Sequence, residues 1–140
     1  MSEFALVDTG PLVAFFDASD EFHPWVAGAL RGLRGPLLTC EPVIAETMHL
    51  LRRMPAAQDV LLGWLGRGSL TVAFDLAQDV AGVRRLMKKY RDQPMSLADA
   101  CLVRMAETIE GHAICTLDED FRVYRRDGGA AIELVIPEGR

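Results

Sequence analysis

The chain alternates between short apolar segments and longer segments whose apolar residues recur at helical spacing. Short apolar runs suit buried strands, and apolar residues three or four positions apart suit one face of a helix. The predicted strands are 4–7, 37–40, 70–74, 113–116 and 131–136. The predicted helices are 11–17, 22–34, 41–53, 56–66, 76–91 and 96–111. This alternation predicts an α/β fold in which helices cover both faces of a parallel sheet.

The composition is that of a globular protein. Of the 140 residues, 50% are hydrophobic and 25% are charged, which excludes the disordered and fibrous classes. The length fits a single domain over residues 1–140. Apolar runs stay far below the ~20 residues of a membrane span, and no leader pattern opens the chain, so we expect a cytoplasmic protein with no membrane partner. The three cysteines have neither disulfide-framework nor zinc-site spacing and are expected to be buried.

The first predicted strand ends at Asp8-Thr9-Gly10, a triplet with two interpretations. Aspartic proteases use Asp-Thr-Gly, but they need an all-β fold and two such aspartates that share a proton. Most of this chain is predicted to be helical, and Pro11 precedes the helix-like segment LVAFFD. The triplet is therefore interpreted as a turn from a strand into a helix.

Four acidic residues are predicted to meet at one edge of the sheet. Asp8 and Asp118 follow predicted strands, whereas Glu46 and Asp99 lie in the first turns of predicted helices. Sites in sheets of this kind form outside the carboxyl ends of the strands. The joint placement of the four acidic residues at this edge therefore predicts one shared carboxylate site.

Each acid also has a purely structural interpretation, which the sequence leaves open. Asp8 could form an Asx turn, and Glu46 could be a solvated residue at the margin of an apolar stripe. Asp99 fits a capping box with the serine three residues before it. Asp118 could cap the turn that follows it, and Asp120 could serve equally well in a site.

Four clustered carboxylates cannot all ionise without a compensating charge. A hard divalent cation such as Mg²⁺ or Mn²⁺ takes oxygen ligands and suits a set of Asp and Glu without His or Cys. Such an ion polarises a phosphoryl oxygen and lowers the pKa of a water molecule. The acidic cluster thus favours metal-dependent hydrolysis of phosphodiester bonds.

Four segments around these acids resemble the acidic blocks of the PIN-domain family, in the order seen in VapC-type toxin ribonucleases. They are ALVDTGPLVAFFD, EPVIAETMHLL, SLADACLVRMAE and TLDEDFRVYR, and together they cover nearly the whole chain. The resemblance implies a three-layer αβα fold with a central, mostly parallel five-stranded sheet. It also implies Mg²⁺- or Mn²⁺-dependent endoribonuclease activity on RNA, an antitoxin protein as partner, and a homodimer.

The resemblance also assigns roles to the acids, block by block. It implies that Asp8 and Asp99 bind the metal directly, and that Glu46 and Asp118 hold its water ligands. Asp120 competes with Asp118 for the fourth role and is ranked second.

Two threonines match small hydroxyl residues of the same blocks. Thr9 follows the first acid, and Thr116 stands two positions before the fourth. The second block departs from the family pattern, which usually has Ser or Thr near the strand end where this chain has Glu41 and Pro42. This departure leaves the start of that helix open but not the role of the acid within it.

The net charge of −5 disfavours a nucleic-acid partner at first sight. Without the four proposed site acids it becomes −1, and two basic runs then stand out. We expect the following members of these runs to contact RNA phosphates: Arg84, Arg85, Lys88 and Arg122. In the purely structural interpretation, both basic runs are solvated helix faces without a role in RNA binding. The alternative to the enzyme is a non-catalytic PIN-like module that binds RNA or a protein.

Overall fold

The centre of the protein is a sheet of five parallel strands in the order β3-β2-β1-β4-β7. The computed structural model describes residues 5–33, 35–109 and 112–138. The sheet strands are β1 Ala5–Val7, β2 Leu37–Thr39, β3 Leu70–Val72, β4 Ala113–Cys115 and β7 Leu134–Val135. The predicted five-stranded parallel sheet is therefore confirmed.

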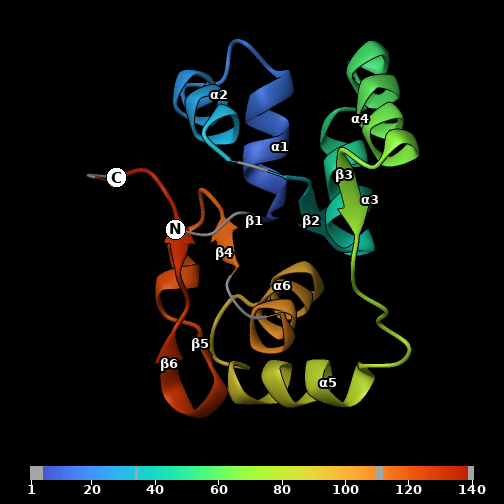
Figure 1. Ribbon diagram of the computed structural model, residues 1–140. Coiled ribbons are helices and arrows are strands. Elements are labelled where there is room, and N and C mark those ends of the chain that lie inside the picture. Colours follow the sequence, from blue (N-terminus) through green and yellow to red (C-terminus); the bar gives the residue numbers. More distant parts are fainter. Residues whose placement is uncertain (1–4, 34, 110–111, 139–140) are drawn as a thin grey trace.

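Within the described segments, six α-helices surround this sheet (Figure 1). They are α1 Thr9–Phe16, α2 His23–Arg31, α3 Glu41–Leu50, α4 Pro55–Arg67, α5 Val80–Lys89 and α6 Leu97–Thr108. In Figure 1, α1 and α2 lie above the strands, and α5 and α6 lie below them. The layered α/β architecture expected from the family resemblance is thus present. No helix of the described segments is long and apolar enough to cross a membrane.

The two central strands, β1 and β4, are buried along their whole length. They pair in register, with Val7 opposite Cys115, and the Asp8 N–H donates to the Cys115 carbonyl at 3.0 Å. Both strands therefore end at the same edge of the sheet. Because the chain leaves each strand at that edge, the residues that follow them are brought together.

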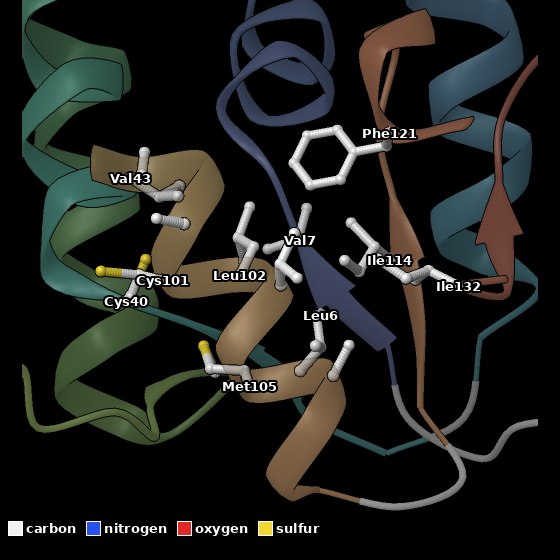
Figure 2. Close-up of a cluster of buried hydrophobic side chains, with 14 of the residues drawn as sticks. Leu6, Val7, Cys40, Val43, Cys101, Leu102, Met105, Ile114, Phe121 and Ile132 are labelled. Atoms are coloured by element: carbon white, nitrogen blue, oxygen red, sulfur yellow. The ribbon is translucent and has the colours of Figure 1, made fainter. Parts of the chain in front are cut away.

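The hydrophobic core lies between these strands and α6, in which eight of twelve residues are buried. Figure 2 shows Leu6 of β1, Leu102 and Met105 of α6, and Ile114 of β4 in this cluster. The three cysteines are free and buried, as the sequence predicts. Because α6 is packed on so many sides, the residues in its first turn have a fixed position relative to the sheet.

The predicted last strand, 131–136, is wrong as a single element. Its beginning belongs to β6 Ala130–Ala131, which pairs antiparallel with β5 Arg125–Arg126. Its end forms β7, which pairs with β4 in the main sheet. The short ribbon β5-β6 turns through η2, Asp127–Gly129, where two glycines adopt positive φ. The apolar pattern does not mark this division because both pieces are only two residues long.

Candidate functional site

A cleft of about 450 Å³ lies at the carboxyl ends of β1 and β4. It is lined by residues that follow these two strands and by residues of α1, α3 and the start of α6. Five of its lining residues are acidic: Asp8, Asp20, Glu46, Asp99 and Asp118. None of the described residues that line the cleft is basic. The four acids predicted to meet therefore lie around one hollow, together with Asp20.

Asp8 occupies the floor of this region, with only 7% of its surface exposed. It is the N-cap of α1, and its Oδ1 accepts a hydrogen bond of 2.8 Å from the Thr9 N–H. Its Oδ2 accepts a hydrogen bond of 2.8 Å from the Thr116 hydroxyl. The structural and functional interpretations of Asp8 are thus compatible, because a capping carboxylate with two oxygens keeps further lone pairs for the cleft.

Asp99 lies in the first turn of α6 and is likewise only 7% exposed. It forms the predicted capping box: its N–H donates to Ser96 Oγ at 3.0 Å, and its Oδ2 accepts from the Ser96 N–H at 3.3 Å. The same Oδ2 accepts a hydrogen bond of 3.1 Å from the Tyr124 hydroxyl. The capping interactions hold the carboxylate at the cleft rather than removing it from there.

Asp118 caps a short 3₁₀ helix, η1 Glu119–Arg122, by accepting a 2.9 Å hydrogen bond from the Asp120 N–H. The Asp118 N–H donates to the Thr116 hydroxyl at 3.0 Å. Asp118 lines the cleft, whereas Asp120 does not. Asp120 nevertheless lies beside Asp118, and partial burial together with the negative charge of Asp118 raises the pKa of Asp120. The geometry therefore favours Asp118 over Asp120 as the fourth acid.

Glu46 reaches the cleft from the middle of α3 and is exposed to solvent. Asp20 reaches it from the connection between α1 and α2, where its Oδ1 accepts from the Phe22 N–H at 2.8 Å. These two acids lie at the wetter rim of the cleft, in contrast to the buried pair Asp8 and Asp99. Charges at a wet rim are screened by solvent, so they cost less to keep ionised.

The buried acids have raised pKa values. Burial raises the pKa of Asp8 to about 6, helped by the negative charges of Asp99 and Asp118 and opposed by the hydrogen bonds from Thr116 and Thr9. Burial is also the main reason why the pKa of Asp99 is raised. Ionising both carboxylates at neutral pH costs free energy, and no basic side chain among the described lining residues offsets this cost. The cleft is therefore suited to a bound positive charge.

A divalent ion fits this donor set if water completes its coordination. Within the described residues, no three His, Cys, Asp or Glu side chains form a metal-binding group by themselves. Mg²⁺ typically uses one or two carboxylates and keeps several waters, which Asp8 and Asp99 can accommodate. In addition, the buried Thr9 hydroxyl at the cleft has no hydrogen-bond partner among the described residues. A water ligand of an ion would satisfy such a group.

The predicted RNA-contacting residues lie outside the cleft. Arg84, Arg85 and Lys88 share one face of α5, where they line a separate hollow with Ala81. Arg85 also pairs with Glu107 of α6 at 2.8 Å. Part of this basic surface thus has a structural role in joining α5 to α6.

Arg122, the fourth residue expected to contact RNA, lies at the end of η1. Its guanidinium pairs with the Glu119 carboxylate. Both side chains of this pair are more than two-fifths exposed, so solvent screens the pair and leaves it weak.

Two residues of the region were missed by the sequence interpretation. Asp20 belongs to a connecting segment without periodicity, and no spacing relates it to the other acids. Tyr124 resembles an ordinary core aromatic, and its ring is fully buried. The signal for its polar role is the hydroxyl, since a buried tyrosine requires a hydrogen-bond partner.

Comparison with known proteins agrees with this geometry. The family model of the PIN domain matches residues 5–127. The chain is also similar to Ribonuclease VapC26 of Mycobacterium tuberculosis (strain ATCC 25618 / H37Rv), with 29% identity over 133 residues. This match covers 93% of the chain and 98% of the relative. The fold, the acidic cleft and the extent of the family match lead to one conclusion: the chain belongs to the PIN domain family.

Proposed function

We propose that the protein is a Mg²⁺- or Mn²⁺-dependent endoribonuclease and the toxin of a toxin–antitoxin pair. The observation that carries this proposal is the cleft, which five carboxylates line without a basic residue among the described part of the chain, and in which burial raises the pKa of Asp8 to about 6. An RNA phosphate would be repelled from such a cleft unless a cation entered first. The similarity to a protein named as a ribonuclease supports RNA as the substrate.

The residues of the cleft divide into two groups in this proposal. Asp8 and Asp99 are buried and would hold the ion. Glu46 and Asp118 would orient its water ligands, with Asp120 as a less favoured substitute. A divalent ion there would polarise a phosphoryl oxygen and lower the pKa of the attacking water. The protein itself supplies fixed carboxylates, because capping and side-chain hydrogen bonds hold Asp8 and Asp99 in place.

The wider setting is also a proposal. We expect a single-domain, cytoplasmic protein that acts as a homodimer and is restrained by an antitoxin protein lying across the acidic pocket. RNA would approach along the basic surface formed by Arg84, Arg85 and Lys88, with Arg122 nearer the fourth acid. Arg84 and Lys88 are exposed on α5, where they can meet phosphates without losing a described ion pair.

The direct test is cleavage of a mixed RNA pool with Mn²⁺, with and without a chelator. We expect cleavage only with the metal, and loss of at least about 100-fold for Asp99→Asn, because the amide keeps the shape but not the charge. Asp59→Asn on the exposed face of α4 is the matched control and should cleave like the wild type. Cleavage that survives chelation would contradict the proposal, and RNA retention without cleavage would favour a non-catalytic binding module.

A further inference from the structure

Besides Asp118, the fourth acidic block contains a second residue whose polar group contacts the site, Tyr124. Tyr124 follows η1, and its ring is fully buried. Its hydroxyl donates a hydrogen bond of 3.1 Å to Oδ2 of Asp99, which is 25 residues away in the sequence. Burial and the negative charge of Asp99 raise the pKa of the Tyr124 phenol above its ordinary value, so the hydroxyl is protonated and donates at neutral pH. Tyr124 therefore contacts a proposed metal ligand without lining the cleft itself.

The hydrogen bonds to Asp99 are distributed unevenly between its two oxygens. Oδ2 accepts from both the Tyr124 hydroxyl and the Ser96 N–H. No described residue donates a hydrogen bond to Oδ1. A carboxylate held through one oxygen has a fixed plane, and its other oxygen keeps lone pairs for a ligand.

The surroundings of Tyr124 keep its hydroxyl in position. Its ring makes edge contacts with Tyr90 and Phe121, at centroid distances of 5.1 and 5.3 Å. The Tyr124 N–H donates to the Asp120 carbonyl at 3.3 Å, which ties the residue to η1. Tyr90 accepts a 2.7 Å hydrogen bond from the Arg125 N–H through its own hydroxyl. Two aromatic neighbours thus hold the ring of Tyr124, and a backbone hydrogen bond holds its main chain.

We propose that Tyr124 is a positioning residue that fixes the Asp99 carboxylate so that Oδ1 faces the divalent ion. The inference rests on the proposed metal-dependent function. Outer hydrogen-bond partners of metal ligands orient the ligand, and their removal typically lowers metal affinity or activity by 10- to 100-fold. A purely structural tyrosine would contribute to folding but would leave the affinity for the ion unchanged.

The test measures Mn²⁺ binding to the RNA-free protein, from the electron paramagnetic resonance signal of unbound Mn²⁺. Tyr124→Phe removes only the hydroxyl and keeps the buried ring. Tyr90→Phe is the matched control. It removes a hydroxyl from the same aromatic cluster, but that hydroxyl accepts a hydrogen bond from a backbone N–H and does not contact a carboxylate. We expect about 10-fold weaker Mn²⁺ binding for Tyr124→Phe and less than about a 2-fold change for Tyr90→Phe.

A spectroscopic measurement keeps the inference testable even if Tyr124→Phe does not fold. The chain has two tyrosines, so Tyr124 is the sole tyrosine of the Tyr90→Phe variant. Binding of Mg²⁺ at Asp99 should change the hydrogen bond of Tyr124 and shift its near-ultraviolet absorption. An unchanged tyrosine spectrum at saturating Mg²⁺ would overturn the inference.

The outcomes separate this inference from the proposed function. If the wild type binds Mn²⁺ and Tyr124→Phe binds it equally well, the positioning role is wrong and the metal-dependent function stands. Equal losses in Tyr124→Phe and Tyr90→Phe would also overturn the role, since they would indicate general loosening of the aromatic cluster. If the wild type itself binds no Mn²⁺, both the function and the inference fail.

Discussion

The hydroxyl of Thr116 donates a hydrogen bond of 2.8 Å to Oδ2 of Asp8, linking two residues that are 108 positions apart. The same hydroxyl accepts a hydrogen bond of 3.0 Å from the Asp118 N–H. One side chain at the end of β4 thus connects the first and the fourth acidic blocks. The Thr116 hydroxyl therefore joins the residues that follow β1 and β4 into one hydrogen-bonded site.

Thr116→Val should therefore damage the site while keeping its shape. The substitution removes the donor to Asp8, whose pKa would rise further, and leaves the Asp118 N–H without its acceptor. We expect 10- to 100-fold slower RNA cleavage at pH 7, by analogy with other outer contacts of metal ligands. The free energy of unfolding in urea should fall by about 1–3 kcal/mol.

Thr116→Ser is the control for this change, because it keeps the hydroxyl and loses only a methyl group. It should retain most of the cleavage rate. If Thr116→Val cleaves RNA as fast as the wild type, the hydrogen bonds of the Thr116 hydroxyl do not contribute to activity.

Asp8→Asn should stabilise the metal-free protein at pH 7.5. The pKa of Asp8 is about 6 in the folded protein against 3.8 ordinarily, so the folded state binds the proton more tightly than the unfolded state. The free energy of unfolding therefore falls as the pH rises from about 4 to above 6, by up to about 3 kcal/mol. The amide removes this cost because it stays neutral.

Urea denaturation in the presence of a chelator, at pH 7.5 and at pH 4.5, measures this effect. The advantage of Asp8→Asn should be largest at pH 7.5 and should shrink toward pH 4.5, where Asp8 is protonated in the folded wild type. Asp59→Asn, on an exposed face of α4, should show no such pH-dependent gain. A less stable Asp8→Asn protein at pH 7.5 would contradict the assigned cost of the buried charge.

Added Mn²⁺ should raise the melting temperature of the wild type. A ligand that binds only the folded state stabilises it by about 2.7 kcal/mol at 100 times its dissociation constant. The gain should be absent in Asp8→Asn and Asp99→Asn, which lose the buried charges proposed to hold the ion. Thermal melts at increasing Mn²⁺ concentration test this, and an equal gain in the wild type and both variants would place the ion elsewhere.

The basic surface of α5 should govern the salt dependence of RNA binding. Arg84 and Lys88 form no ion pair with a described residue, whereas Arg85 is paired with Glu107. The double variant Arg84→Ala, Lys88→Ala should bind RNA more weakly at low salt. Its slope of log affinity against log salt should fall by roughly 0.7 for each lost phosphate contact with single-stranded RNA.

Arg67→Ala is the control for this experiment, since Arg67 lies at the end of α4, away from α5 in Figure 1. It should leave the slope unchanged. If the α5 variant also keeps the wild-type slope, these residues are only a solvated helix face.

The order of strands and helices along the chain could be predicted because the buried segments are strongly apolar. The residues of β1 and β4 are completely buried, so their composition alone indicates central strands. The division of the last predicted strand could not be predicted, because pairing of β6 with β5 and of β7 with β4 depends on tertiary contacts. Segments of two residues carry too little periodicity to show this.

The carboxylates of the site could be predicted from their place after strands and in first helical turns. Asp8 and Asp118 follow adjacent parallel strands, so their proximity is a consequence of topology. The contact from Tyr124 to Asp99 could not be predicted, since nothing in the sequence says where a buried hydroxyl points. Asp20 lies in a connecting segment whose path depends on the packing of α1 against α2.

The proposed metal site is tested by locating a divalent ion in crystals of the protein soaked in Mn²⁺, from its anomalous scattering. We expect a peak in the cleft within bonding distance of the carboxylates of Asp8 and Asp99, with water completing the coordination. A peak bound elsewhere, with none at these two residues in crystals that bind Mn²⁺, would contradict the proposed metal site.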